Sequence, residues 1–214
     1  MIYRLPRWIM LGGALLALNA GFVNSLALLS FAHQAVSHVT GTITVAASAW
    51  STGGGWLPPL WIVFSFLLGA VISGVVVGNE SLTAGRRYGV ALLIEATLLA
   101  AAWWCLRQQW SAGEWLASAA CGLQNAMVAT YSGSVIRTTH LTGIVSDIGS
   151  WLGNRLAGRA VNRRQLLLHT ILLVGFVSGA AVGSQLYALW QIDALWTAII
   201  LVTVTALIYQ GWRR

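Results

Sequence analysis

The chain has 214 residues, of which 57% are hydrophobic and 8% are charged, and its mean hydropathy is +0.75. Soluble globular domains have about 25% charged residues, so this composition excludes an ordinary soluble enzyme. It also excludes a disordered chain and a secreted domain held together by disulfides. The composition therefore predicts an integral membrane protein built of helices, with the lipid bilayer as its main partner.

The net charge of +7 comes from 12 basic and 5 acidic residues, and the basic residues are all arginines. A membrane protein concentrates such residues in its cytoplasmic loops, so the charge predicts no nucleic-acid partner. Cys105 and Cys121 stand in apolar runs without metal-ligand spacing, and we interpret them as small core residues. We expect no metal and no cofactor.

Some stretches of the chain are long and apolar enough for a helix that crosses a hydrocarbon layer of ~30 Å. In chain order these predicted spans are 8–31, 57–79, 88–107, 113–135, 165–188 and 192–212. Two further segments, 38–52 and 140–154, are apolar but short and rich in Thr, Ser and Gly. At ~1.5 Å per residue neither crosses the layer comfortably, so each is a short span or a re-entrant half-helix.

The positions of the arginines distinguish these two alternatives. With six spans, two re-entrant segments and a cytoplasmic N-terminus, every arginine except Arg107 lies on the cytoplasmic side. These arginines are Arg4, Arg7, Arg86, Arg87, Arg137, Arg155, Arg159, Arg163, Arg164, Arg213 and Arg214. If both short segments cross fully, Arg86, Arg87 and Arg137 face outward instead. The positive-inside rule favours six spans with both termini in the cytoplasm.

Three short motifs recur in the same order in the two halves of the chain. GFVNS at 21–25 is followed by GLQNA at 122–126, HVTG at 38–41 by HLTG at 140–143, and FLLGA at 66–70 by FVSGA at 176–180. The order predicts an internal duplication within a single membrane domain, 1–214, with repeats over 8–107 and 113–212. Each half has three spans and one half-helix, so the second repeat is inverted relative to the first, as in many transporters.

The His-x-Thr-Gly motif begins each short segment. Thr40 or Thr142 is suited to be the N-cap of the half-helix, because a hydroxyl there accepts from free backbone N–H groups. If the half-helices enter from opposite faces, their positive ends meet near the membrane centre beside His38 and His140. Such a site attracts a small anion or a polar solute. Alternatively, the histidines cap neighbouring helices and the glycines only permit close packing.

Other polar residues stand near these motifs. Asn24 and Asn125 lie inside apolar spans, where they either orient a solute or hydrogen-bond to the interrupted segments. Arg137 either draws anions toward the site or marks the cytoplasmic boundary. The predicted solute-binding residues are Asn24, His38, Thr40, Gly41, Asn125, Arg137, His140, Thr142 and Gly143.

Two carboxylates lie within predicted membrane segments, where such groups are costly and frequently functional. Asp147 stands about two helical turns after His140 on the same face, and it aligns with Val45 of the first half. It is either a proton-coupling residue or the ion-pair partner of Arg137 or of an arginine in 155–164. Glu95 either snorkels toward the interface or pairs with an arginine at 86–87.

The motifs at 21–24, 38–41 and 122–143 resemble those of the YoaK-like family of bacterial inner-membrane proteins, and the likeness covers nearly the whole chain. The stretch 122–143 is its most specific part. The resemblance implies a small multi-pass protein of the bacterial inner membrane whose function is unassigned. It supplies no substrate.

We therefore expect an all-α membrane protein that acts as a secondary transporter or channel for a small polar or anionic solute. Its site is expected at the repeat interface, near the membrane midplane. The sequence has no GxSxG, Walker, HExxH or dinucleotide motif, so an enzyme is not expected. The alternative is a non-transporting membrane protein, such as a sensor, an assembly factor or a partner-binding subunit. The sequence leaves open whether the chain forms a homo-oligomer.

Overall fold

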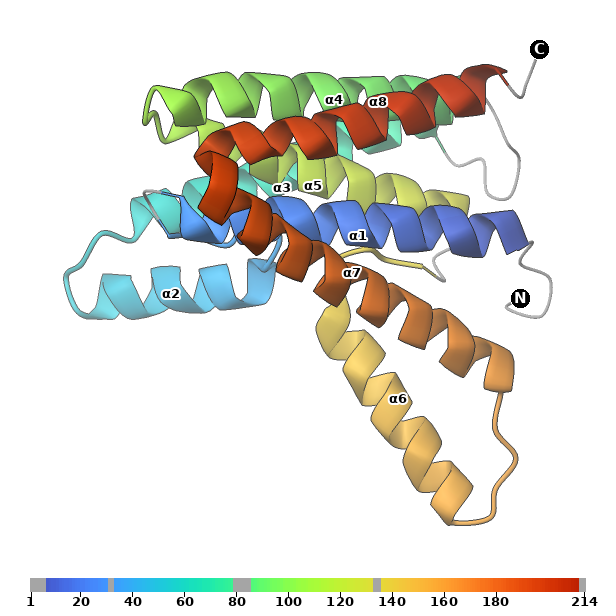
Figure 1. Ribbon diagram of the computed structural model, residues 1–214. Coiled ribbons are helices and arrows are strands. Elements are labelled where there is room, and N and C mark those ends of the chain that lie inside the picture. Colours follow the sequence, from blue (N-terminus) through green and yellow to red (C-terminus); the bar gives the residue numbers. More distant parts are fainter. Residues whose placement is uncertain (1–6, 31–32, 79–85, 133–135, 212–214) are drawn as a thin grey trace.

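The computed structural model describes residues 7–30, 33–78, 86–132 and 136–211, and the regular elements within these ranges are all helical (Figure 1). They are α1 (Arg7–Leu29), α2 (Val39–Ser51), α3 (Leu57–Val77), α4 (Arg86–Arg107), α5 (Ala112–Tyr131), α6 (Leu141–Leu156), α7 (Arg163–Trp190), a short 3₁₀ helix η2 (Gln191–Ala194) and α8 (Leu195–Gly211). The prediction of an all-helical chain is confirmed for these residues. Arg4, Arg213 and Arg214 lie outside them.

Some of these helices are long and apolar enough to cross a membrane. In the described ranges they form four segments: Ile9–Leu29, Leu57–Val77, Arg87–Arg107 and the 49-residue segment Arg163–Gly211. The last segment comprises α7 and α8, and the chain reverses between them at Gln191, whose φ is 51°. The 20-residue helix α5 is not among them, and it contains Glu114, Gln124 and Asn125. The chain is therefore a helical protein with membrane-spanning character.

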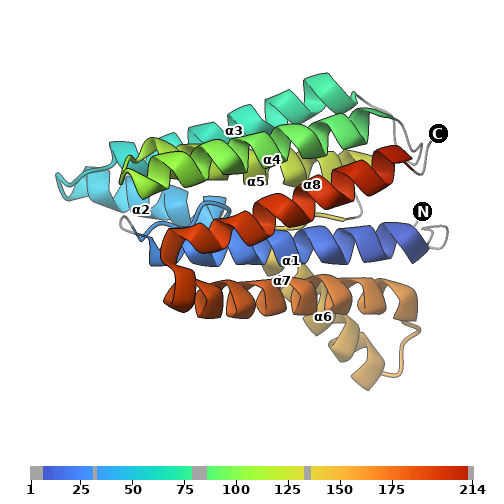
Figure 2. The ribbon, with the colours of Figure 1, turned by 45° about the horizontal axis from the view of Figure 1, so that its top comes forward.

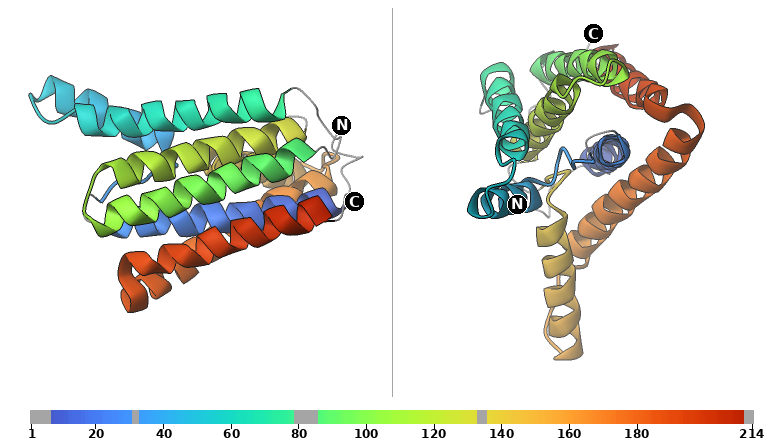
Figure 3. Two further views of the ribbon diagram at one scale, coloured as in Figure 1. Left: turned by 90° about the horizontal axis from the view of Figure 1, so that it is seen from above. Right: turned by 90° about the vertical axis from the view of Figure 1, so that its left-hand side faces the viewer.

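The long helices run roughly side by side, and in the view along them the others are arranged around α1 (Figures 2 and 3). The short helices α2 and α6 both begin beside the middle of the bundle (Figure 1). From there α2 runs toward one end and α6 runs toward the other while diverging from the bundle. Helix α2 packs against α3, and α6 packs against α7. Both short helices thus begin part-way along the bundle rather than at one of its ends.

Two close helix pairs, α1 with α7 and α3 with α5, have the most extensive contacts in the structure. At each pair, glycines let one backbone approach the carbonyl groups of the other, so that an added Cβ would collide with a carbonyl oxygen. These contacts join Gly21 to Phe176, Gly179 to Leu18, Gly122 to Phe66 and Gly69 to Ala119. Small residues at such positions permit close packing of helices in a membrane. Each contact of one pair has a counterpart in the other.

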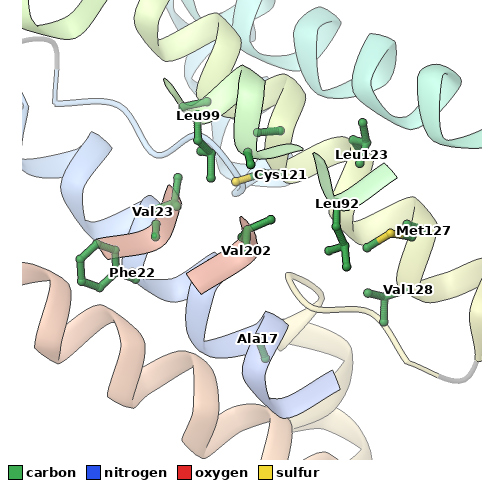
Figure 4. Close-up of a cluster of buried hydrophobic side chains, with 14 of the residues drawn as sticks. Ala17, Phe22, Val23, Leu92, Leu99, Cys121, Leu123, Met127, Val128 and Val202 are labelled. Atoms are coloured by element: carbon green, nitrogen blue, oxygen red, sulfur yellow. The ribbon is translucent and has the colours of Figure 1, made fainter. Parts of the chain in front are cut away.

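The buried apolar side chains form one cluster between α1, α4, α5 and α8 (Figure 4). Val23, Leu123 and Val202 contribute to it and are at most 2% exposed. Burial of such side chains by several helices holds α1 inside the bundle. This core positions the segments that carry the recurring motifs of the two halves.

A polar cluster joins α4 to the corner between α7 and α8. The indole Nε1 of Trp103 donates to Asp193 Oδ1 at 2.8 Å, and Arg107 Nη1 lies 3.6 Å from the same oxygen. The Arg107 guanidinium also stands 5.4 Å from the centroid of the Trp103 ring. Arg107, the arginine that the predicted topology sets apart from the rest, therefore has a carboxylate partner.

Candidate functional site

The two short helices begin in the same way. His38 and His140 occupy the N-cap positions of α2 and α6, with φ of −99° and −93° and no capping hydrogen bond from the side chain. The helices start directly after them, so Thr40 and Thr142 lie within the first turn. The prediction that a threonine is the N-cap is therefore wrong, because each helix begins two residues earlier than a threonine cap requires.

The glycine of each motif accommodates the histidine ring. A Cβ atom at Gly41 would lie 2.7 Å from Nδ1 of His38. The ring of His140 covers Gly143 in the same manner, and a Cβ there would collide with it. The spacing His-x-x-Gly thus lets an imidazole fold back over the first turn of its own helix. Both histidines remain exposed on their other side.

The two asparagines of the motifs each accept a hydrogen bond from the residue that precedes a motif histidine. Asn24 Oδ1 accepts hydrogen bonds from Ser37, from its backbone N–H at 3.1 Å and from its hydroxyl at 2.9 Å. Asn125 Oδ1 accepts from the backbone N–H of Thr139 at 3.4 Å. Of the two interpretations of these asparagines, the observed contacts match hydrogen bonding to the interrupted segments. They set where α2 and α6 begin.

An open groove of about 530 Å³ lies where the chain passes from α5 into α6 and against α7. It is lined by Arg137, His140, Gly143, Ile144, Asp147, His169 and Leu172. The groove thus brings together four of the residues singled out from the sequence, from the second half of the chain. Its cationic and imidazole groups suit a small anion, and its carboxylate suits exchange of a proton.

Asp147 meets a partner that the sequence did not suggest. Its Oδ2 lies 3.6 Å from Nδ1 of His169, which α7 supplies. The His169 side chain is 9% exposed, whereas the Asp147 side chain is 57% exposed, so solvent reaches the pair from the carboxylate side. A smaller cavity of about 210 Å³ continues from this pair between α6 and α7, and Trp151 and Asn162 are among its lining residues.

Other predicted site residues lie away from this groove. Its lining includes none of the residues from α1 or α2, namely Asn24, His38, Thr40 and Gly41. Asn125 is not among the lining residues and accepts from the backbone N–H of Thr139, and Thr142 lies on the exposed side of α6. The groove is therefore built from one motif, although the motif occurs twice in the chain.

A buried polar network beside the groove was missed by sequence reasoning. Asn19 Nδ2 donates to Glu95 Oε1 and to Gln124 Oε1, at 3.1 Å in each case. Gln124 Nε2 donates in turn to the Leu16 carbonyl at 2.8 Å and to Thr138 Oγ1 at 3.2 Å. Glu95 is 1% exposed, so the prediction that it snorkels to the interface is wrong. Its carboxylate points into the bundle, where a neighbouring helix supplies an amide.

One signal for this network was present in the sequence. Asn19, Glu95 and Gln124 all interrupt apolar spans, and buried polar side chains in a membrane find partners on neighbouring helices. The sequence does not indicate which helices pack against one another. His169 has the same signal, because it interrupts the apolar span 165–188, but the sequence does not indicate that Asp147 is its partner. In the described part of the chain, no three His, Cys, Asp or Glu side chains gather as metal ligands.

The chain matches, over residues 12–208, a protein family described as "Protein of unknown function (DUF1275)". The chain belongs to this DUF1275 family. Membership agrees with the resemblance of the motifs to an uncharacterised family of membrane proteins, and the groove lies within the matched region. No curated protein and no solved structure matches the chain. The groove and the helices of this DUF1275 member are therefore the features that bear on its function.

Proposed function

We propose that the protein is a secondary transporter or channel for a small polar or anionic solute. The observation that carries the proposal is the groove in which Arg137, His140 and Asp147 converge at the start of an interrupted helix. Helix N-termini and arginines bind anions, and interrupted helices supply the substrate sites of many transporters. Binding and passage require no chemical step, so the proposal is for transport rather than for an enzyme.

The proposal includes six spans, as two inverted repeats of three, in a bacterial inner membrane with both termini cytoplasmic. It is supported by the paired glycine contacts and by the paired bonds of Asn24 and Asn125. It is also supported by the arrangement of the loops. The connections at 52–56 and 108–111 lie toward one end of the bundle, and the connection at 157–162 lies toward the other (Figures 1 and 3).

Cysteine labelling tests this topology. In a background without Cys105 and Cys121, we expect a membrane-impermeant maleimide to label Gly55→Cys and Ser111→Cys in intact cells. Ala157→Cys should react only after the membrane is opened. If the short helices crossed fully, positions 55 and 111 would face the cytoplasm, so protection of both from external reagent would contradict six spans.

Ligand binding tests the groove. We expect one or more solutes from a panel of small anions (chloride, formate, phosphate) and neutral compounds (glycerol) to raise the melting temperature of the purified protein. A ligand at a hundred times its Kd stabilises a folded protein by about 2.7 kcal/mol. The stabilisation should be lost in Arg137→Gln and in His140→Ala. It should persist in Arg155→Gln, which removes an exposed arginine of α6 outside the groove.

Flux measurements in proteoliposomes then test transport of a solute identified in this way. We expect Asp147→Asn to change the dependence of uptake on pH between about 5 and 8, the range in which histidines titrate, and to leave membrane insertion intact. Uptake by Asp147→Asn that follows the same pH profile as the wild type would contradict a role of this carboxylate in coupling.

A second candidate function has its own observation. The close glycine contacts of α1 with α7 and of α3 with α5 are the packing expected of a membrane protein whose duplication serves assembly alone. Under this alternative the protein is a sensor, an assembly factor or a partner-binding subunit. Its signature in the same experiments is that no solute of the panel stabilises the protein and none crosses the proteoliposome membrane.

A further inference from the structure

The buried network contains two polar atoms without a partner. In the described part of the chain, Glu95 Oε2 and Asn19 Oδ1 are both buried and accept no hydrogen bond. Both N–H groups of the Asn19 amide are in use, one on Glu95 Oε1 and one on Gln124 Oε1. An unsatisfied buried polar atom costs about 1–3 kcal/mol, so two on adjacent side chains require an explanation.

One proton would satisfy both atoms. A protonated carboxyl has one O–H donor, and a primary amide has an oxygen that accepts. When an amide N–H already donates to one carboxyl oxygen, a proton on the other oxygen is directed toward the amide oxygen. The two groups then form a ring of two hydrogen bonds. Asn19 and Glu95 have the first of these bonds, and their two unsatisfied oxygens would be the donor and the acceptor of the second.

We propose that Glu95 carries a proton on Oε2 and shares it with Asn19 Oδ1, and that this proton controls the groove. The proton is the only species bound or released. Its release leaves a carboxylate that draws on the Asn19 N–H groups more strongly, because hydrogen bonds to an ionised acceptor are about twice as strong as neutral ones. Asn19 is thereby pulled away from Gln124.

Three consecutive hydrogen bonds connect Glu95, through Asn19 and Gln124, to Thr138 beside the groove. Gln124 receives one N–H of Asn19 and donates to Thr138, which is 1% exposed and lies between Arg137 and His140 in the chain. A shift of the Gln124 amide therefore moves the segment that presents both groove residues. This second part of the proposal rests on the proposed transport function, whereas the proton on Glu95 does not depend on it.

Other titratable groups lie on the elements packed against α4, which are α3, α5, α8 and η2. Helix α3 has none. On the other three elements, the titratable side chains that the structure describes are Glu114 and Cys121 of α5, Tyr209 of α8 and Asp193 of η2. The Cys121 thiol is buried and is close enough to Glu95 for an electrostatic interaction. Asp193 pairs with Arg107, and Glu114 accepts from Ser30 near the start of α5.

Infrared difference spectroscopy of the purified full chain in lipid nanodiscs tests the proton. We expect a carbonyl band of a protonated carboxylic acid that is lost in Glu95→Gln and retained in Glu114→Gln and Asp147→Asn. In Asn19→Leu the band should shift to higher frequency, because the acid loses both of its hydrogen bonds to the amide. Persistence of every acid band in Glu95→Gln, or an unshifted Glu95 band in Asn19→Leu, would overturn the proposal.

Tryptophan fluorescence tests the connection to the groove. Trp151 lines the cavity beside Asp147 and His169, and its signal is isolated by subtracting the spectrum of Trp151→Phe. Two other ionisable side chains, Asp147 and His169, line the same cavity as this indole. The change in Trp151 fluorescence that originates at Glu95 is therefore the part of the pH dependence that is lost in both Gln124→Leu and Glu95→Gln. An unchanged profile in both variants would overturn the connection. If the Glu95 band is present but no solute crosses the proteoliposome membrane, the transport proposal is refuted and the proposal of a proton on Glu95 still holds.

Discussion

Gly69→Ala is expected to destabilise the protein by about 1–3 kcal/mol, the usual cost of forcing extra atoms into a packed interior. The added methyl group would collide with the carbonyl oxygen of Ala119, and a backbone atom cannot move aside as a side chain can. Helices α3 and α5 must separate to accommodate it. Because this pair is among the most extensive in the molecule, the loss spreads along the whole contact.

The matched control lies on the same helix. Gly74 has no atom within 4 Å of an added Cβ. Gly74→Ala is therefore expected to be neutral or to stabilise α3 by up to about 1 kcal/mol through helix propensity. Thermal unfolding in detergent, followed by circular dichroism, compares the two variants. Equal melting temperatures would show that the α3–α5 contact tolerates a methyl group and is not closely packed.

The second large effect is expected at the buried network. Asn19→Leu should cost about 1–3 kcal/mol for each polar partner that it leaves unsatisfied, and it leaves two, Glu95 and Gln124. Glu95→Leu is expected to cost less, because it leaves only one side chain, Asn19, without its partner. In the double variant the two losses overlap, since the shared hydrogen bond can be broken only once.

A double-mutant cycle measures this overlap. We expect the double variant to be more stable than the sum of the two single effects by about 0.5–3 kcal/mol, the range for residues in one hydrogen-bond network. Thr44 on α2 is exposed and far from the network, so Asn19→Leu combined with Thr44→Ala should be additive within about 0.5 kcal/mol. Additivity of the Asn19 and Glu95 substitutions would contradict the hydrogen bond between them.

The helices were predictable because their signal is local. A run of apolar residues, such as 57–79, predicts both that a helix forms and that it is long. The observed helix Leu57–Val77 agrees with this prediction. The short helices also follow from composition and length. The exact start of α6 does not, because a His-x-Thr-Gly motif permits either His140 or Thr142 as the N-cap. Only the backbone conformation distinguishes them.

The site was predictable only in part. Arg137, His140, Gly143 and Asp147 lie close in sequence at helical spacing, so one groove can hold them without knowledge of the tertiary structure. His169 comes from a different helix, and the pair it forms with Asp147 depends on how α7 is rotated about its axis. Contacts across helices, such as Asn19 with Glu95, need the neighbour relations that periodicity within one helix cannot supply.

Helices α1 and α3 of the first half both have their most extensive contacts with helices of the second half, α7 and α5. This arrangement has a consequence for the order of assembly. Helix α3 finds its main partner, α5, as soon as residue 131 has been made, whereas α1 must wait for α7, more than 130 residues further along the chain. Contacts between residues so far apart form late, because the chain between them has to be ordered first. During synthesis α1 therefore remains without its principal partner until the last helices enter the bilayer. Neither α1 nor α3 has its most extensive contact within its own half of the chain.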